Sequence, residues 1–406
     1  MLTGRRYRLN LSDEQAARCE EFGRVCRAVW NTGLEQRRAY RRRGAWVNYR
    51  QQAAELAESK SEHEWLNAAP GHCLQQTLVD LDKVCRTHGT WKVRWRSARR
   101  WEPSFRLPEG NKMLIERLNR RWGRVRLPKL GWVTFRISHP LGGVVRSATV
   151  SRDGNHWYVS FVVDDGKTTP KEHAWPDSGV GVDRGVVVAV ACSDGWMRDR
   201  RFTTRGEIKR YRRLQQKLAR QKKGSASRRQ TLAAMRSISG RERDRRADFC
   251  AWTAHRLTER NALVVLEDLR TRNMTRSAKG TVEQPGSNVK AKAGLNRSIL
   301  GKGWRQLATA LKGRARYSGT TVVEVPAWFT SQTCSACAAV DPGSRESQAR
   351  FRCTHCGHTM NADVNAARNI LAAGLAVTAC GDLDAGRSVK QEPAGNREEL
   401  LLQPTY

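Results

Sequence analysis

Two Cys-x-x-Cys pairs constrain this sequence more than any other feature. The pairs lie 15 residues apart and consist of Cys334 with Cys337 and Cys353 with Cys356. Each short turn places two thiolates on one side of an ion, and two turns complete a tetrahedral cage. A single pair would also suit a redox centre or two buried thiols, but two pairs at this spacing predict a zinc ribbon. Four cysteines leave no open position, so we expect one structural Zn²⁺, with His355 and His358 as substitute ligands.

The chain carries a large excess of positive charge. Its 406 residues include 74 Lys and Arg against 39 Asp and Glu, a formal net charge of +35. Because such a chain repels itself and its charge is spread along most of the sequence, nucleic acid is the predicted partner. Hydrophobic residues make up 39% of the chain, enough for packed cores. This length suggests roughly two to four domains. The composition argues against a disordered tail protein and an ordinary metabolic enzyme.

No segment has the pattern of a membrane span or an export signal. The longest apolar runs are 186–192 and, counting one glycine, 370–377. Both fall far short of the roughly 20 residues that a spanning helix needs. The N-terminal residues include two arginines and no apolar signal segment. We therefore expect a cytoplasmic protein with reduced cysteines and no membrane partner.

The first 165 residues combine helical and strand-like patterns. A strand is expected over 5–10, and a capping-box signature at Ser12 starts a long helix that ends near Arg43. A second helix is expected over 72–88. Strand patterns then fill 101–165, with a hairpin turning at Asp153-Gly154.

A polar segment with two prolines, 164–178, marks a domain boundary. Beyond it, 205–260 reads as mostly basic helix interrupted near Gly224 and Gly240, and 275–297 reads as a mobile Gly/Ser/Lys-rich loop. The other expected elements are strands over 179–191, 261–266 and 320–325 and helices over 298–317 and 362–374.

Three acidic residues occupy positions where acids are unusual. Asp183 interrupts an apolar strand pattern, Glu267 ends the apolar run 263–266, and Asp363 opens an Ala- and Asn-rich helix. A carboxylate at the end of a buried strand is costly unless a divalent cation compensates it. Two Mg²⁺ ions roughly 4 Å apart would stabilise the attacking and the leaving oxygen when a phosphodiester bond is cleaved. Taken singly, each acid also has a structural explanation. Asp183 could be a turn residue before Gly185, Glu267 could pair with an arginine, and Asp363 could be a favourable charge at a helix N-terminus.

Two segments are candidates for nucleic-acid contact. The segment 90–101 mixes arginines, which fit phosphate oxygens, with tryptophans, which offer stacking planes. A tryptophan-rich core edge explains those tryptophans equally well. In the basic helix after 205, the charges have few acidic partners, which favours a nucleic-acid groove over a solvated face. The candidate contacts are Trp91, Arg94, Arg96, Arg99, Arg100, Lys209, Arg210, Arg212, Arg213, Lys217 and Arg220.

Taken in order, these motifs resemble the TnpB family, RNA-guided nucleases encoded by bacterial transposons, and the related compact type V CRISPR effectors. The resemblance covers nearly the whole chain. The matching segments are 29–31, 74–82, 127–131, 157–161, 181–185, 266–269, 294–300, 330–337, 363–370 and 389–393. Two departures are the alanine at 338, where the family usually has glycine, and a somewhat long spacer between the cysteine pairs. Neither removes a ligand.

The resemblance implies an activity and its partners. Asp183, Glu267 and Asp363 would bind two Mg²⁺ ions in a RuvC-type, RNase H-like site that cleaves DNA. A structured guide RNA would pair with one strand of a double-stranded DNA target, while the protein reads a short flanking motif. The protein would be a nucleoid-associated bacterial protein, and a monomer is favoured.

The resemblance also implies an α+β multidomain fold. An N-terminal, β-barrel-like wedge domain carries a helical insertion, and a C-terminal RuvC/RNase H-like α/β nuclease domain carries an inserted zinc ribbon. The expected boundaries are 1–10 and 101–165 for the wedge, 11–100 for the helical recognition domain, 166–178 for a linker, 179–329 and 360–380 for the nuclease with basic helices over 205–260, 330–359 for the zinc ribbon and 381–406 for a flexible tail.

Two other functions remain compatible with the residues. An RNA-guided protein could repress or mark DNA without cutting it, although that function needs no acidic triad. A transposase that joins strands itself would use a similar acidic site, although the resemblance disfavours it.

Overall fold

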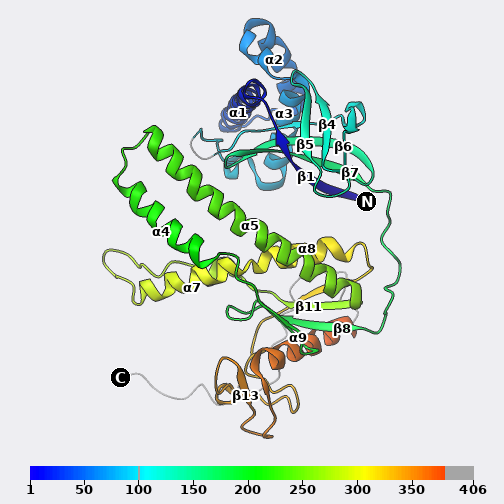
Figure 1. Cartoon of the computed structure of the whole chain (residues 1–406), viewed down its shortest axis with the longest axis vertical. Coiled ribbons are helices and arrows are strands. Elements are labelled where there is room, and N and C mark those ends of the chain that lie inside the picture. The colour runs from blue at the N-terminus through cyan, green and yellow to red at the C-terminus, as the bar shows by residue number, and fades with distance from the viewer. Residues whose placement is uncertain (99–100, 380–406) are drawn as a thin grey trace. The chain divides into compact units, whose positions relative to one another are not determined.

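The computed structural model describes residues 1–98 and 101–379. They form two compact units of a mixed α/β protein (Figure 1). The first unit contains Met1–Thr168 and Phe202–Arg245, and the second contains Thr169–Arg201 and the chain from Arg246 onward. The division differs from the expected one, because the helical chain up to Arg245 groups with the N-terminal unit. Arg99, Arg100 and the expected tail over 381–406 lie outside the described residues.

A seven-stranded antiparallel sheet forms the core of the first unit, in the order β2-β6-β7-β1-β5-β4-β3. β1 lies between β7 and β5, with Tyr7 opposite Val159, so the first residues complete a sheet built mainly from later ones. Buried and half-buried residues alternate along β7, and the predicted hairpin at Asp153-Gly154 is confirmed. The strands are β1 Leu2–Asn10, β2 Ser104–Leu107, β3 Ile115–Arg117, β4 Trp122–Leu127, β5 Gly131–Arg136, β6 Val144–Asp153 and β7 His156–Asp164.

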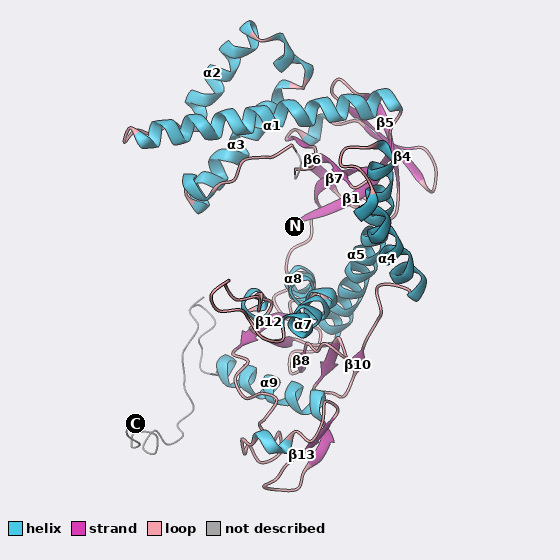
Figure 2. Ribbon diagram, turned by 90° about the vertical axis from the view of Figure 1, so that its left-hand side faces the viewer, coloured by secondary structure: helices cyan, strands magenta, loops and turns pink. Residues whose placement is uncertain are grey.

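Three helices accompany this sheet (Figure 2). They are α1 Asp13–Arg42, α2 Tyr49–Glu62 and α3 Gly71–His88, with short 3₁₀ turns at Glu64–Ala68, Thr90–Lys92 and Gly110–Lys112. The predicted capping box is confirmed: the Gln15 N–H donates to Ser12 Oγ at 3.1 Å, and the Ser12 N–H donates to Gln15 Oε1 at 3.2 Å. α1 packs against α3, where Gly33 lets the Leu78 and Leu81 side chains approach closely. The sequence pattern did not predict α2, which buries only Gln52.

A five-stranded sheet organises the second unit, in the order β10-β9-β8-β11-β12. β8, β11 and β12 are parallel, whereas β9 and β10 add an antiparallel edge. α9 (Ala362–Ala379) packs against β8 and β11 (Figure 1). The strands are β8 Gly179–Asp183, β9 Val190–Cys192, β10 Met197–Arg198, β11 Leu263–Glu267 and β12 Thr321–Val325, and the other helices of this unit are α6 Thr271–Met274, α7 Val289–Lys302 and α8 Trp304–Ala315.

The basic helical region differs from its prediction at one point. α4 (Arg205–Arg220) and α5 (Ala226–Arg260) are separated near Gly224, as predicted, but α5 continues through Gly240. A single helical glycine costs only about 1 kcal/mol relative to alanine, which is too little to interrupt a helix of 35 residues.

The segment around residue 300 also differs from its prediction. α7 begins at Val289, so the last part of the expected 275–297 loop is helical. The helix expected over 298–317 is instead the end of α7 followed by α8, because Gly303 takes a left-handed conformation (φ +72°) that breaks the helix.

The cysteine region lies between β12 and α9. It contains the 3₁₀ turn Pro342–Ser344 and a two-stranded sheet, β13 Arg350–Arg352 and β14 Thr359–Asn361. Across the described ranges, no helix is long and apolar enough to cross a lipid bilayer.

Candidate functional site

Two of the acidic residues end adjacent parallel strands. Asp183 is the last residue of β8 and Glu267 the last of β11. Val182 pairs in register with Leu266, so the next position on each strand is one of these acids. Because the carboxyl ends of parallel strands meet at one edge of a sheet, the fold places Asp183 and Glu267 side by side in backbone register.

Asp363 is brought to this edge by α9. The Asn361 side chain caps the helix: its Oδ1 accepts the N–H of Asp363 at 2.9 Å and that of Val364 at 3.2 Å. The helix lies very close to β8, because a Cβ on Gly181 would sit 2.0 Å from the carbonyl oxygen of Ala367. Only glycine at this strand position permits that approach.

The negative charges of Glu267 and Asp363 act on Asp183. Burial, together with the negative charges of Glu267 and Asp363, raises the pKa of Asp183 to about 7. Burial also raises the pKa of Glu267 and that of Asp363. Like charges shift a pKa in this way at short range, and a divalent cation relieves their repulsion. Asp183 therefore lies near enough to Glu267 and Asp363 to respond to their charges, and carboxylate oxygens are ligands that Mg²⁺ prefers.

Two further side chains contact the carboxylates, and sequence reasoning did not identify them. Thr330 Oγ1 donates a 2.6 Å hydrogen bond to Glu267 Oε1. Arg345 Nη2 lies 3.3 Å from Asp363 Oδ1. Nothing in the local sequence separates Arg345 from the other basic residues among the 74 in the chain. Thr330 lies in a recognised segment but has no distinctive spacing.

The buried Arg184 side chain holds the strand ends at this edge through hydrogen bonds to the backbone. It is only 5% exposed, and its guanidinium donates to the backbone oxygens of Glu267 and Trp304. These bonds tie the ends of β8 and β11 to the start of α8. Arg184 was visible in the sequence beside Asp183, but its buried structural contacts were not.

The four cysteines gather as the sequence predicts. Their sulfur atoms all lie within 4.8 Å of one another, and among the described residues they alone form a group of three or more His, Cys, Asp or Glu ligands close enough to share an ion. The distance is 3.7 Å between the Cys334 and Cys356 sulfurs and 3.6 Å between those of Cys337 and Cys353. A tetrahedron of thiolates about 2.3 Å from Zn²⁺ has edges of roughly 3.8 Å, so the quartet fits this ion without either histidine.

The two cysteine turns have the same backbone hydrogen bond and the same left-handed final residue. In the first, the Ala338 N–H donates to the Cys334 carbonyl at 2.9 Å, and in the second the Gly357 N–H donates to the Cys353 carbonyl at 3.0 Å. Both turns end in a left-handed residue, with φ +60° at Ala338 and +73° at Gly357. The alanine adopts the glycine conformation, so the departure from the family pattern strains the first turn without opening it.

The tryptophan-rich segment divides into exposed and packed residues. Trp91 and Trp95 are 57% and 42% exposed, and the Arg38 guanidinium lies 5.8 and 5.0 Å from their ring centroids. Arg94 is exposed as well. Arg96 instead stacks on buried Trp30 at 3.7 Å, and burial lowers the pKa of Arg96 to about 10. Arg96 therefore follows the core-edge alternative, while the exposed residues remain candidate contacts.

α4 presents a continuous basic surface. Its candidate residues are all exposed and form no ion pair within the described part of the chain; they are Lys209, Arg210, Arg212, Arg213, Lys217 and Arg220. The opposite side holds Glu207, whose carboxylate binds Arg241 and Arg245 of α5. Glu207 therefore joins α4 to α5, and the exposed cations of α4 remain available for a nucleic-acid partner.

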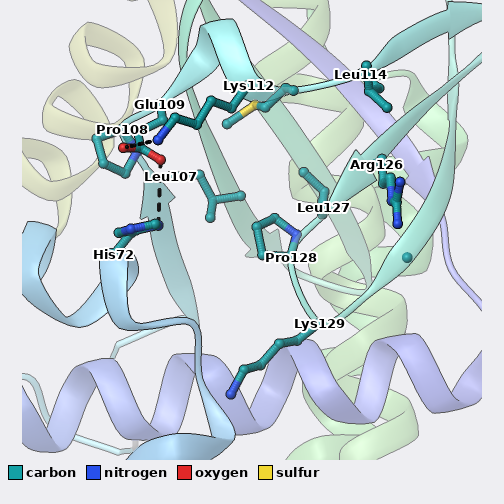
Figure 3. A pocket seen from close by; sticks show the side chains of 12 residues that line it. His72, Leu107, Pro108, Glu109, Lys112, Leu114, Arg126, Leu127, Pro128 and Lys129 are labelled. Atoms are coloured by element: carbon teal, nitrogen blue, oxygen red, sulfur yellow. Dashed lines mark hydrogen bonds and ion pairs between the residues drawn. The ribbon is translucent and has the colours of Figure 1, made fainter.

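A cavity of about 390 Å³ lies in the first unit (Figure 3). Within it, Glu109 receives a 3.0 Å hydrogen bond from Lys112 and lies 3.7 Å from His72. Its other charged lining residues are Arg126 and Lys129. None of the three clustered carboxylates lines this cavity.

Comparisons with known proteins show which family and which fold this chain is similar to. Residues 160–278 match the family model described as "Probable transposase", and 304–370 match the "Cas12f1-like, TNB domain". Residues 1–45 match a "Helix-turn-helix domain", although here they form β1 and the single long helix α1. The fold resembles the protein in the cryo-EM structure of a Cas12f1-sgRNA-target DNA complex, with a TM-score of 0.57, 13% identity and coverage of 88% of this chain and 83% of that one.

Two curated relatives match almost from end to end. The Escherichia coli K12 protein named "Putative RNA-guided DNA endonuclease InsQ" is 36% identical over 394 residues, 96% of both chains. A Streptomyces pristinaespiralis protein named "Putative RNA-guided DNA endonuclease" is 32% identical over 405 residues, 96% of this chain and 95% of that one. Identity at this level along the full length shows that the chain belongs to the TnpB family.

Proposed function

We propose that this protein is an RNA-guided DNA endonuclease that hydrolyses phosphodiester bonds at a RuvC-like site. The observation that carries the proposal is the convergence of Asp183, Glu267 and Asp363 from β8, β11 and α9. The names of both full-length relatives point to the same activity.

The donor atoms of the two sites support metal binding. The three carboxylates would hold two Mg²⁺ ions, which would activate water and stabilise charge on the scissile phosphate. Arg345, already beside Asp363, would face the phosphate as a bidentate donor. The cysteine quartet would hold one structural Zn²⁺.

The two units of the fold would have different roles. The second unit, with three parallel strands, an antiparallel edge and α9, would be the RNase H-like nuclease with its inserted zinc ribbon. The seven-stranded sheet of the first unit would be the barrel-like wedge, with α1–α3 as the recognition helices.

Nucleic acid would occupy the basic surfaces. The exposed cations of α4 and the arginines beside Trp91 and Trp95 would bind phosphates of a structured guide RNA and a double-stranded DNA target. Such contacts supply affinity and salt dependence, while base pairing by the guide selects the sequence.

The first experiment tests the guide. The protein is expressed with its native flanking DNA and purified, and the RNA that accompanies it is sequenced. One discrete species mapping to the flanking element is expected. Heterogeneous cellular RNA that salt removes would contradict the guide proposal.

The second experiment tests the chemistry. The purified complex is assayed for Mg²⁺-dependent cleavage of a plasmid carrying the guide-matched target. Asp183→Ala is expected to abolish cleavage while the RNA remains bound. Full cleavage by this variant would rule out the proposed site, and no cleavage by the parent would favour a protein that binds DNA without cutting it.

A second candidate function is strand transfer, because the model matched by residues 160–278 is described as "Probable transposase". It is tested by incubating the protein with transposon ends and target DNA. Joined products would establish it, and hydrolysis alone would exclude it.

A further inference from the structure

Two large aromatic side chains project from the turn that follows β12. Trp328 is 56% exposed and Phe329 is 52% exposed. Neither ring stacks on another aromatic ring or lies under a guanidinium within the described part of the chain. This distinguishes them from Trp91 and Trp95, whose ring centroids lie within 5.8 Å of the Arg38 guanidinium. Both rings are exposed, belong to consecutive residues and take no part in the buried core.

Phe329 is also held in an unusual backbone conformation. Its φ is +58°, in the left-handed region that bulky residues avoid. Three hydrogen bonds to its carbonyl oxygen maintain this conformation: from the Gln332 N–H at 2.9 Å, the Thr333 N–H at 2.9 Å and Thr333 Oγ1 at 2.8 Å. Asparagine or glycine would fit the position with less strain. A strained residue that is over-determined by its surroundings is characteristic of functional sites.

The turn is anchored directly to the carboxylate cluster. Thr330, the next residue, donates to Glu267 Oε1 at 2.6 Å, and its carbonyl accepts a hydrogen bond from Asn369 of α9 at 2.9 Å. Consecutive Cα atoms are only about 3.8 Å apart, so the backbone that carries the two exposed rings lies close to Glu267. The bonds fix the turn to both β11 and the helix that carries Asp363.

We propose that Trp328 and Phe329 form a stacking surface for unpaired bases of the DNA strand that enters the nuclease site. An aromatic face binds any base, because every base has a π surface, and so it suits a nuclease site that leaves the choice of sequence to the guide RNA. Stacking beside Glu267 would hold the adjoining phosphate at the carboxylates. The inference rests on the proposed nuclease function and assigns its substrate subsite to an unpaired DNA strand.

The test distinguishes the effect of losing an aromatic ring from the effect of disturbing the fold. Phe329→Asn removes the ring but favours the left-handed backbone, Trp328→Ala removes the second ring, and Phe329→Tyr keeps both ring and strain. Trp175→Ala is the matched control, since Trp175 is 64% exposed in the same unit and no part of the cluster. All are made in the Asp183→Ala background, as the complex with guide RNA.

Binding is measured with a short single-stranded DNA that contains 2-aminopurine, whose fluorescence is quenched by stacking. Phe329→Asn and Trp328→Ala are each expected to weaken binding about tenfold and to reduce the quenching. Phe329→Tyr and Trp175→Ala are expected to match the parent. The melting temperature of Phe329→Asn is expected to equal or exceed that of the parent, which shows that lost binding is not lost folding.

Parent-like binding and quenching in both ring-deletion variants would overturn the inference. A change confined to self-association would overturn it as well, because the rings would then be an interface between copies. With Asp183 restored, undiminished cleavage by Phe329→Asn would refute the stacking subsite alone. Absence of cleavage by the wild-type complex would instead refute the proposed function.

Discussion

The Thr330 hydroxyl donates a 2.6 Å hydrogen bond to Glu267 Oε1, and this bond joins the chain leading into the cysteine region to the carboxylate cluster. Asn369 extends the connection, since its side chain donates to the carbonyls of Thr330 and Thr333 at 2.9 and 2.7 Å. The cysteine quartet and the carboxylates are thus linked through hydrogen bonds as well as through the chain. Groups that orient a metal ligand in this way commonly matter nearly as much as the ligand itself.

Replacement of Thr330 by valine tests this link. The variant keeps the shape of the side chain but removes the hydrogen bond that orients Glu267, so the Mg²⁺ concentration for half-maximal cleavage should rise at least about tenfold. Thr330→Ser, which keeps the hydroxyl, should retain activity near that of the parent. The check is a Mg²⁺ titration of target cleavage; coincident curves for Thr330→Val and the parent would show that the bond is dispensable.

The close contact between β8 and α9 predicts the effect of a single methyl group. In Gly181→Ala the new Cβ would meet the Ala367 carbonyl oxygen at 2.0 Å, and neither backbone can move freely. We expect a loss of about 3 kcal/mol in the free energy of unfolding and loss of cleavage. Gly294→Ala on α7 is the control: a Cβ there meets nothing within 4 Å, and the helix should be unchanged or slightly stabilised. Urea denaturation of the two variants measures the difference, and equal stability would contradict the packing account.

The strained cysteine turn predicts an unusual stabilising substitution. Ala338 adopts φ +60°, so Ala338→Gly should relieve about 1 kcal/mol of backbone strain and tighten zinc retention. Gly357→Ala, at the equivalent position of the second turn, should weaken zinc retention by a similar amount. The measurement is the rate of zinc release to a chromogenic chelator, beginning from protein with one zinc per chain. Faster release from Ala338→Gly than from the parent would refute the prediction.

The ion pairs that join α4 to α5 predict a pH-dependent stability. Hydrogen bonds from Arg245, together with the Thr204 N–H and Arg241, hold the pKa of Glu207 well below its usual range. Because the folded-state pKa is depressed, the stabilisation is present above the ordinary glutamate pKa, about 4.3, and is lost as the pH falls toward the folded value. Glu207→Gln should therefore be less stable than the parent at pH 7, with the gap shrinking only below about pH 4.3.

Unfolding curves of both proteins between pH 7.5 and pH 3 check this prediction. Glu283→Gln, at an exposed position, serves as the control and should follow the parent throughout. A gap between Glu207→Gln and the parent that stays constant to pH 3, or that opens only at low pH, would contradict the assigned ion pairs.

The sequence by itself determined the local features. The cysteine quartet follows from ligand chemistry and spacing, and the capping box at Ser12 and the hairpin at Asp153 follow from side-chain and turn chemistry within a few residues. The individual acids were also visible, because Asp183 and Glu267 end apolar runs. Local helix propensity was less reliable, because the free-energy differences between residues are small. It predicted an interruption at Gly240, although the long helix α5 tolerates this glycine, and it did not predict α2.

Only the tertiary structure decided which distant residues meet. The register of β8 with β11 places Asp183 beside Glu267, and the glycine contact at Gly181 brings α9 and Asp363 to the same edge. Thr330 and Arg345 join the cluster through chain folding that no local pattern encodes. The physical reason is that ligand spacing and capping are satisfied within a few residues, whereas strand register and helix packing depend on the simultaneous burial of segments far apart in the chain.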